Sequence, residues 1–277
     1  MGSNGEFYVR FWGVRGSIPC PGPETVRYGG NTSCLEVRCG DRLLILDAGT
    51  GLRLLDEALR PEAPLHADLL MTHTHLDHVC GWPYFRALTR PDTRLRAWAG
   101  HLGPAHRLDA VMERFLKDPA TPVHTGNVQA KIDWRHYEAG ATLDLGDGIE
   151  ARTAALNHPN NACGYRIGYA GKSICYITDT EHVPGEPDRN VLGLIEGADI
   201  VIYDATYTDA EFPNFITWGH STWQEGVRLA DRAGVATLVI FHHDPGHDDD
   251  AMDRIAADAE AARPGTLVAV EGMVLAP

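Results

Sequence analysis

The feature that most constrains this chain is a cluster of metal-binding side chains in one short segment, residues 72–78. His73, His75, Asp77 and His78 follow directly on an apolar run, so the sequence predicts that they lie on a loop at the end of a buried strand. Such loops commonly carry catalytic groups. Imidazole and carboxylate suit zinc and similar cations. In a turn, the first two histidines can converge on one metal and the last two residues on its neighbour.

A chance cluster of polar loop residues is the simpler alternative. The chain holds 14 histidines among 277 residues, so one histidine in a loop carries little information. Three histidines within six positions, with an aspartate among them and a predicted strand before them, are a much rarer coincidence. The sequence therefore favours a metal site.

Short β-branched or aliphatic runs recur along the chain, each bounded by Gly, Pro, Asn or Asp. They predict strands at residues 8–12, 34–39, 43–46, 69–71, 95–98, 132–137, 149–156, 165–169, 173–177, 200–203, 237–241 and 267–270. Helical patterns lie between them at residues 51–59, 104–117, 188–196, 222–233 and 249–262. This alternation predicts an α/β protein. We expect a single domain over residues 1–277, with residues 1–6 as a flexible leader.

Three helix starts carry capping signals. Ser221 precedes Gln224 by three positions, which predicts a capping hydroxyl at Ser221. The acidic run 248–250 places negative charge at the positive end of a helix. Pro187 or Asp188 opens the helix at 188–196.

The charge balance narrows the range of partners and compartments. With 24 basic and 38 acidic residues the net charge is −14, which repels polyanions and makes nucleic acid an unfavoured partner. No apolar run approaches the roughly 20 residues that span a bilayer, and the N-terminus lacks a signal-peptide pattern. The six cysteines form no C-x-x-C pair. We therefore expect a cytoplasmic protein with reduced thiols and no membrane contact, and we allow for a homodimer.

The segment 72–78 resembles the H-x-H-x-D-H signature of the metallo-β-lactamase superfamily, and the resemblance extends from Phe11 to His242. In that family a histidine, a bridging aspartate and a last histidine follow, each at a strand end. His158, Asp179 and His242 occupy these places here. The resemblance implies a four-layer αβ/βα sandwich, two mixed β-sheets flanked by helices, with the metals at one edge between the sheets.

The same resemblance implies two metal sites, expected to hold Zn²⁺, with Mn²⁺ or Fe²⁺ as alternatives. One ligand set is His73, His75 and His158, the other is Asp77, His78 and His242, and Asp179 bridges both. Asp204 also ends a predicted strand and competes as the bridge, and His243 competes with His242. We favour Asp179 because its Asp-Thr pair resembles the family motif. We favour His242 from the position of the strand end.

The segment 219–222, Gly-His-Ser-Thr, resembles the His-Ser-Thr element of the ribonuclease Z and cyclic phosphate phosphodiesterase branch. In that branch the histidine, here His220, assists at the scissile phosphate. Asp179 follows His158 by only 21 positions, with an apparent hairpin at 170–172, which leaves no room there for a long tRNA-gripping arm. The phosphoribosyl cyclic phosphate phosphodiesterase is closer in overall plan, although Cys20 stands alone where that enzyme has a cysteine-rich zinc site.

The expected function is therefore a dinuclear metal-dependent phosphodiesterase that hydrolyses a small or cyclic phosphate ester through a metal-bridging hydroxide. Asp77 is expected to orient the nucleophile and His220 to stabilise charge or donate a proton to the leaving oxygen. The alternative is a hydrolase of a lactone, thioester or β-lactam with the same centre. Arg15 is a weaker candidate as a phosphate contact. The aromatic side chains at 82–85 and 212–218 either line a substrate cleft or pack in the core.

Overall fold

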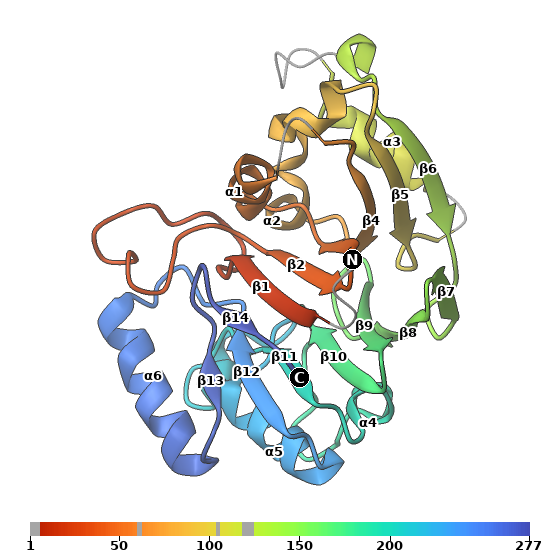
Figure 1. Cartoon of the computed structure of the whole chain (residues 1–277). Helices are drawn as coiled ribbons and strands as arrows, with labels where there is room; N and C mark the ends of the chain where they lie inside the picture. The colour runs from red at the N-terminus through yellow and green to blue at the C-terminus, as the bar shows by residue number, and fades with distance from the viewer. Residues whose placement is uncertain (1–5, 60–62, 104–105, 118–124) are drawn as a thin grey trace.

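The computed structural model describes residues 6–59, 63–103, 106–117 and 125–277. Two mixed sheets of seven strands each are stacked face to face (Figure 1). The first sheet consists, in spatial order, of β14 (Val274–Leu275), β1 (Phe7–Gly13), β2 (Cys34–Cys39), β3 (Arg42–Leu46), β4 (His66–Met71), β5 (Arg94–Ala99) and β6 (Lys131–His136). The second consists of β13 (Leu267–Val268), β12 (Thr237–Phe241), β11 (Ile200–Asp204), β10 (Lys172–Ile177), β9 (Ala162–Tyr169), β8 (Ile149–Leu156) and β7 (Thr142–Gly146).

Helices cover the outer face of each sheet, as Figure 1 shows. The first sheet carries α1 (Gly51–Ala58), α2 (Leu76–Val79) and α3 (Leu108–Arg114), and the second carries α4 (Arg189–Ile195), α5 (Trp223–Ala233) and α6 (Asp249–Ala262). Short 3-10 turns lie at Trp82–Tyr84, Arg86–Thr89, Thr125–Asn127 and Phe212–Asn214. Alternate apolar side chains of both sheets form the central core, and two further clusters lie beneath the helices. The predicted four-layer αβ/βα sandwich is confirmed.

Both sheets direct their parallel strands to one edge. β3 to β6 are parallel in the first sheet, and β10 to β13 are parallel in the second. Tyr165 and Tyr176 of the second sheet reach across this edge, where their hydroxyls donate to the Met71 carbonyl at 2.7 Å and to Asp47 at 3.1 Å. These bonds fix the ends of β3 and β4 against the second sheet.

The sequence missed two strands and misplaced one cap. β7 alternates exposed and buried residues over only five positions, and β14 pairs just two residues with β1. The hydroxyl that caps α5 belongs to Thr222, which accepts from the Glu225 amide, so the prediction of Ser221 was wrong. Asp188 and Asp248 cap α4 and α6 through their side chains. Residues 1–5 of the expected leader and residues 104–105 of the expected helix at 104–117 lie outside the described residues.

Candidate metal centre

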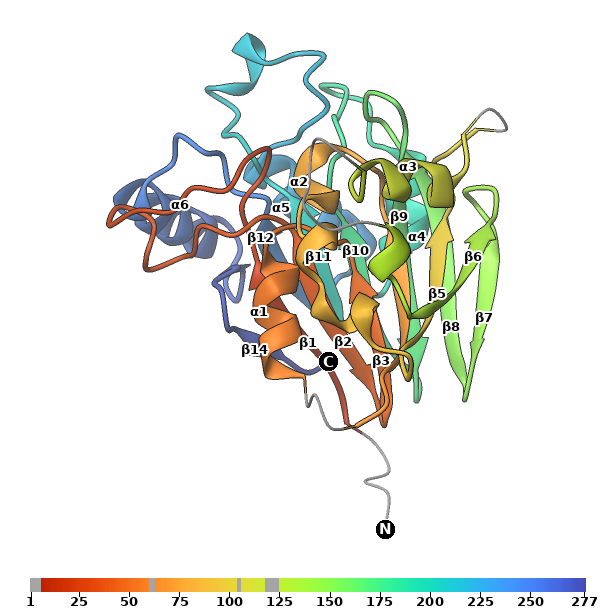
Figure 2. The ribbon, with the colours of Figure 1, turned by 90° about the horizontal axis from the view of Figure 1, so that it is seen from above.

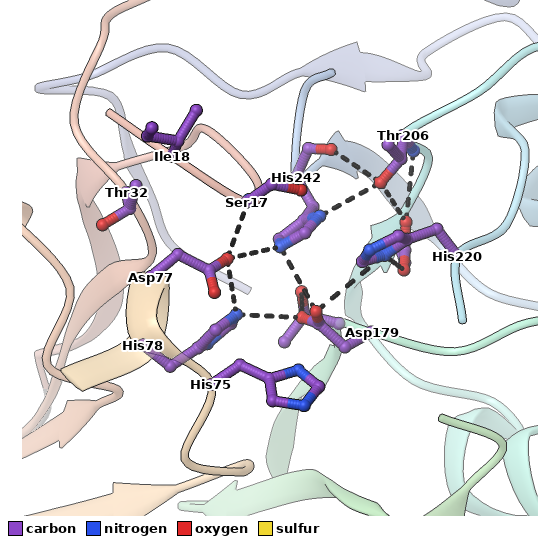
Figure 3. Close-up of polar contacts among 12 residues, drawn as sticks. Ser17, Ile18, Thr32, His75, Asp77, His78, Asp179, Thr206, His220 and His242 are labelled. Carbon is purple, nitrogen blue, oxygen red and sulfur yellow. Dashed lines mark hydrogen bonds and ion pairs between the residues drawn. The ribbon is translucent and has the colours of Figure 1, made fainter. Parts of the chain in front are cut away.

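The loop after β4 and the first turn of α2 hold the four side chains of the segment 72–78. His73, Asp77 and His78 are buried, and His75 is half-buried. The backbone amide of Ser17, in the loop after β1, donates to Asp77 Oδ2 at 2.8 Å (Figure 3). This bond holds the carboxylate toward the interior of the site.

The structure brings all seven predicted ligands together, from loops that follow four different strands. The ligand atoms of one group, His73, His75 and His158, lie within 4.8 Å of one another. Those of the second group, Asp77, His78, Asp179 and His242, satisfy the same limit. These groups match the two predicted ligand sets, and the second also contains the predicted bridging carboxylate.

Asp179 lies between the two groups. Its Oδ1 is 3.7 Å from His73 Nε2. The same Oδ1 is 3.4 Å from His242 Nε2, and Oδ2 is 3.2 Å from His78 Nε2 (Figure 3). Asp204 has no such central position, although it forms a further group within 4.8 Å with His220 and His242. The geometry therefore fits Asp179 as the bridging carboxylate.

His243, the competitor of His242, faces away from the cluster. It is fully buried, and its Nε2 lies 2.8 Å from the Ala269 carbonyl oxygen. His242 instead directs its Nε2 toward Asp77 Oδ2 at 3.3 Å. Its backbone has φ +64°, a conformation that a residue with a side chain seldom adopts, so the loop after β12 is strained in order to present this ring.

The chemistry of these groups fits divalent cations. Nε2 of His73, His78 and His242 is buried without a hydrogen-bond partner among the described residues. Four carboxylates, those of Asp47, Asp77, Asp179 and Asp204, are also buried here, and in the described part of the chain no Lys or Arg pairs with them. Buried polar atoms and charges are costly unless they are paired or coordinate a metal. Imidazole and carboxylate donors are those that zinc takes.

A second layer of bonds fixes the orientation of the histidine rings. His78 Nδ1 lies 2.8 Å from Asp47 Oδ2, His158 Nδ1 lies 2.7 Å from the Gly219 carbonyl oxygen, and His242 Nδ1 lies 3.0 Å from Thr206 Oγ1. With Nδ1 occupied, Nε2 of each ring is left available to a metal. Our sequence reasoning missed Asp47, although a polar residue directly after a buried strand, before Ala48 and Gly49, is a usable signal.

His220 is the remaining ring at the centre, and it is held by Asp204. Its Nδ1 lies 3.0 Å from Asp204 Oδ2 and 3.8 Å from Asp179 Oδ1. Burial lowers the pKa of His220, but the charge and hydrogen bond of Asp204 outweigh burial and raise the pKa to about 9. Asp204 also accepts from the amides of Thr180 and Thr206. It therefore lies where an acceptor can orient the His220 ring.

Two other expectations are decided by burial. The Arg15 guanidinium is fully buried and donates to the carbonyls of Gly29, Asp244 and His247, so the prediction of a phosphate contact was wrong. Among the aromatic residues, Trp82, Phe85 and Phe212 are buried and serve packing, whereas Tyr84 and Trp218 are exposed.

Two stacked mixed sheets with a His/Asp cluster at one edge define the class of this protein, the metallo-β-lactamase fold. Comparison with known families identifies it further. The chain belongs to the beta-lactamase superfamily, because the model of the family described as "Beta-lactamase superfamily domain" matches residues 42–243.

Relatives are similar over most of their length. A ribonuclease Z of Mycobacterium marinum is 28% identical over 251 residues, which cover 82% of this chain and 83% of the relative. Among solved structures, the metallo-beta-lactamase fold protein YhfI from Bacillus subtilis has a TM-score of 0.72 at 18% identity, covering 98% of this chain and 99% of YhfI. The short form of human tRNase Z has a TM-score of 0.71 at 19% identity, covering 97% and 98%. At these identities the two structures show the fold alone.

A search of the described residues for membrane spans finds no helix that is both long and apolar enough to cross a bilayer.

Proposed function

We propose that this protein is a phosphodiesterase with two divalent metal ions, Zn²⁺ first among the candidates, and that it cleaves a small or cyclic phosphate ester. His73, His75 and His158 would hold one ion, Asp77, His78 and His242 the other, and Asp179 both. When bound, the ions lower the pKa of a coordinated water from about 15.7 toward neutrality and polarise the phosphoryl oxygens.

The observation that carries the proposal is the buried pair of His220 and Asp204 beside these ligands. The leaving oxygen of an alkyl phosphodiester is a poor leaving group unless it receives a proton. His220 is buried, is stabilised as a cation by Asp204 at 3.0 Å, and stacks on His242 with 4.8 Å between ring centroids. A donor of this kind, at the edge of the ligand cluster, suits the departure of an alkoxide.

Three residues of the chain would have distinct roles in the reaction. Asp77, fixed by the Ser17 amide, orients the attacking group on its side of the cluster. His220 donates a proton to the leaving oxygen and is then reprotonated from solvent. Asp204 keeps His220 in the protonated form and fixes its ring through Nδ1.

The short chain between His158 and Asp179 favours a small substrate. This stretch forms the hairpin of β9 and β10, whose partners run from Tyr169 and Lys172 to Tyr165 and Tyr176, so no arm extends from it. The similarity to relatives named ribonuclease Z goes against our expectation that nucleic acid is an unfavoured partner. RNA therefore stands beside small esters as a substrate to be tested.

Metal analysis with a substrate panel tests the proposal. We expect about two metals per chain and turnover of bis(p-nitrophenyl) phosphate. For a diester with an alkyl leaving group, His220→Ala should lose most of the turnover with the metal content kept. The panel also contains a lactone, a thioester, a β-lactam and a short unstructured RNA. Turnover of the carboxyl derivatives alone would contradict a phosphodiesterase and favour the alternative hydrolase, and RNA cleavage in preference to small diesters would contradict the small substrate.

A further inference from the structure

The segment between β11 and α5 projects from the body of the protein, as Figure 2 shows. It ends at His220 and carries two large exposed apolar side chains, Ile216 at 53% and Trp218 at 61% exposure. Exposed apolar residues that are scattered singly are common on protein surfaces. Exposure alone therefore does not indicate a binding role for Trp218.

A succession of four rings leads from His220 to the surface. Tyr207 lies edge-on to His220 with 6.1 Å between centroids, and it stacks on Phe215 at 4.3 Å with an angle of 6° between the planes. Phe215 meets Trp218 edge to face at 5.4 Å and 80°. Tyr207 is buried, Phe215 is half-buried and Trp218 is exposed. The indole is thus packed on one side and open to solvent on the rest.

The backbone at Trp218 is strained. Thr217 has φ +77°, which a β-branched residue rarely adopts. The following Gly219 donates its amide to Glu181 at 2.9 Å, and its carbonyl oxygen lies 2.7 Å from Nδ1 of the candidate ligand His158. Backbone strain of this kind persists only where the surroundings enforce it, and it gathers at functional sites. The turn that presents the indole is therefore tied to the metal centre.

We propose that Trp218 is a recognition residue that stacks on a planar aromatic ring of the substrate, on the His220 side of the phosphate. The substrate class is then a phosphodiester with an aryl or nucleobase-bearing ester group. A rigid, exposed indole suits such a ring because stacking needs a flat surface whose orientation is already fixed. This inference rests on the proposed function, since it assumes that a phosphoryl group binds at the ligand cluster.

Calorimetric titration of the metal-loaded protein tests the proposal without relying on turnover. Phenyl phosphate and adenosine 5′-monophosphate supply a ring, and methyl phosphate is the ligand without one. We expect at least one ring ligand to bind about tenfold more tightly than methyl phosphate, which is the usual scale for stacking on an aromatic side chain. Trp218→Ala should abolish this ratio and Trp218→Phe should keep most of it, with the affinity for methyl phosphate unchanged in both. Tighter binding of adenosine 5′-monophosphate alone would identify a nucleobase as the ring that Trp218 recognises. Tighter binding of both ring ligands would show that any aryl group is accepted.

Tyr84→Ala is the matched control. Tyr84 is an aromatic residue with a similar exposure, 59%, but it lies in the 3-10 turn after α2 and not in the segment before α5. An equal affinity for ring and methyl ligands in the wild type overturns the proposal. So does a ratio that survives Trp218→Ala, or one that is lost in Tyr84→Ala instead. Ring-selective binding without turnover of any diester would contradict the proposed phosphodiesterase function but would still support ring recognition by Trp218.

Discussion

Replacing Asp204 by asparagine tests whether a buried carboxylate controls the protonation of His220. Asp204 is fully buried and lies 3.0 Å from His220 Nδ1. Asparagine keeps the size of the side chain but removes its charge. Its amide NH₂ would also face either His220 and the Thr180 amide, which share Oδ2 of the carboxylate, or the Thr206 amide, which donates to Oδ1. The substitution therefore removes the interaction that raises the pKa of His220.

The size of the effect follows from the two protonation states. With its pKa at about 9, His220 is about 90% protonated at pH 8, whereas an imidazole at about 6.5 is about 3% protonated. The fraction able to donate a proton thus falls about 30-fold. Bound cations neutralise Asp77 and Asp179, which also raise the pKa of His220, so Asp204 then supplies most of what remains.

The assay is the pH dependence of kcat for a diester with an alkyl leaving group, which needs the proton. Because the pKa is raised, wild-type activity should persist to a higher pH than that of Asp204→Asn and should have declined by about pH 9. In Asp204→Asn the decline should begin below pH 7. A p-nitrophenyl diester, whose leaving group departs without a proton, should show a much smaller difference between the two proteins.

Asp68→Asn is the matched control. Asp68 is equally buried, but it pairs with Arg42 and Arg96 and lies on β4 away from the ligands. It should lower stability by about 1–3 kcal/mol, as removal of a buried charged partner does, and leave the pH profile unchanged. An alkaline limb that is the same in Asp204→Asn and the wild type, with metal content retained, would refute the role given to Asp204.

Three further predictions concern the metal centre and the strained turn. Chelation should lower the melting temperature by about 5–10 °C in scanning calorimetry, because buried carboxylates lose their counter-ions, and added zinc should restore it. Gly16→Ala should reduce bound metal, measured by elemental analysis, since its Cβ would lie 2.4 Å from His242 Nδ1, whereas Gly22→Ala has open space and should change nothing. Thr217→Gly should stabilise the fold by about 1 kcal/mol in urea unfolding, because glycine tolerates φ +77°; a loss of stability would contradict the strain.

The sequence allowed the candidate ligands to be predicted because they lie in short segments that follow apolar runs. His242 is favoured in this way, since strand ends are visible in the pattern of apolar residues, whereas Asp179 is favoured over Asp204 only because its Asp-Thr pair resembles a family motif. The same pattern found most strands. It failed for β7 and β14, which are short and not strongly apolar. β14 is held by pairing with β1 at the other end of the chain, and β7 by a tight turn to β8.

Tertiary structure decided which of these residues act together. Asp204 and Asp179 both follow strands of the second sheet, and only the stacking of the two sheets shows that Asp179 faces the loop after β4 while Asp204 faces His220. Nothing local distinguishes two carboxylates that each follow an apolar strand.

The same holds for Trp218, whose role depends on ring contacts and backbone strain that no local pattern encodes. The H-x-H-x-D-H segment determined the chemistry of the centre because donor atoms are properties of residues. Their grouping, their protonation and the surface offered to a substrate depend on distances of a few ångströms between distant parts of the chain, and those distances exist only once the two sheets have packed.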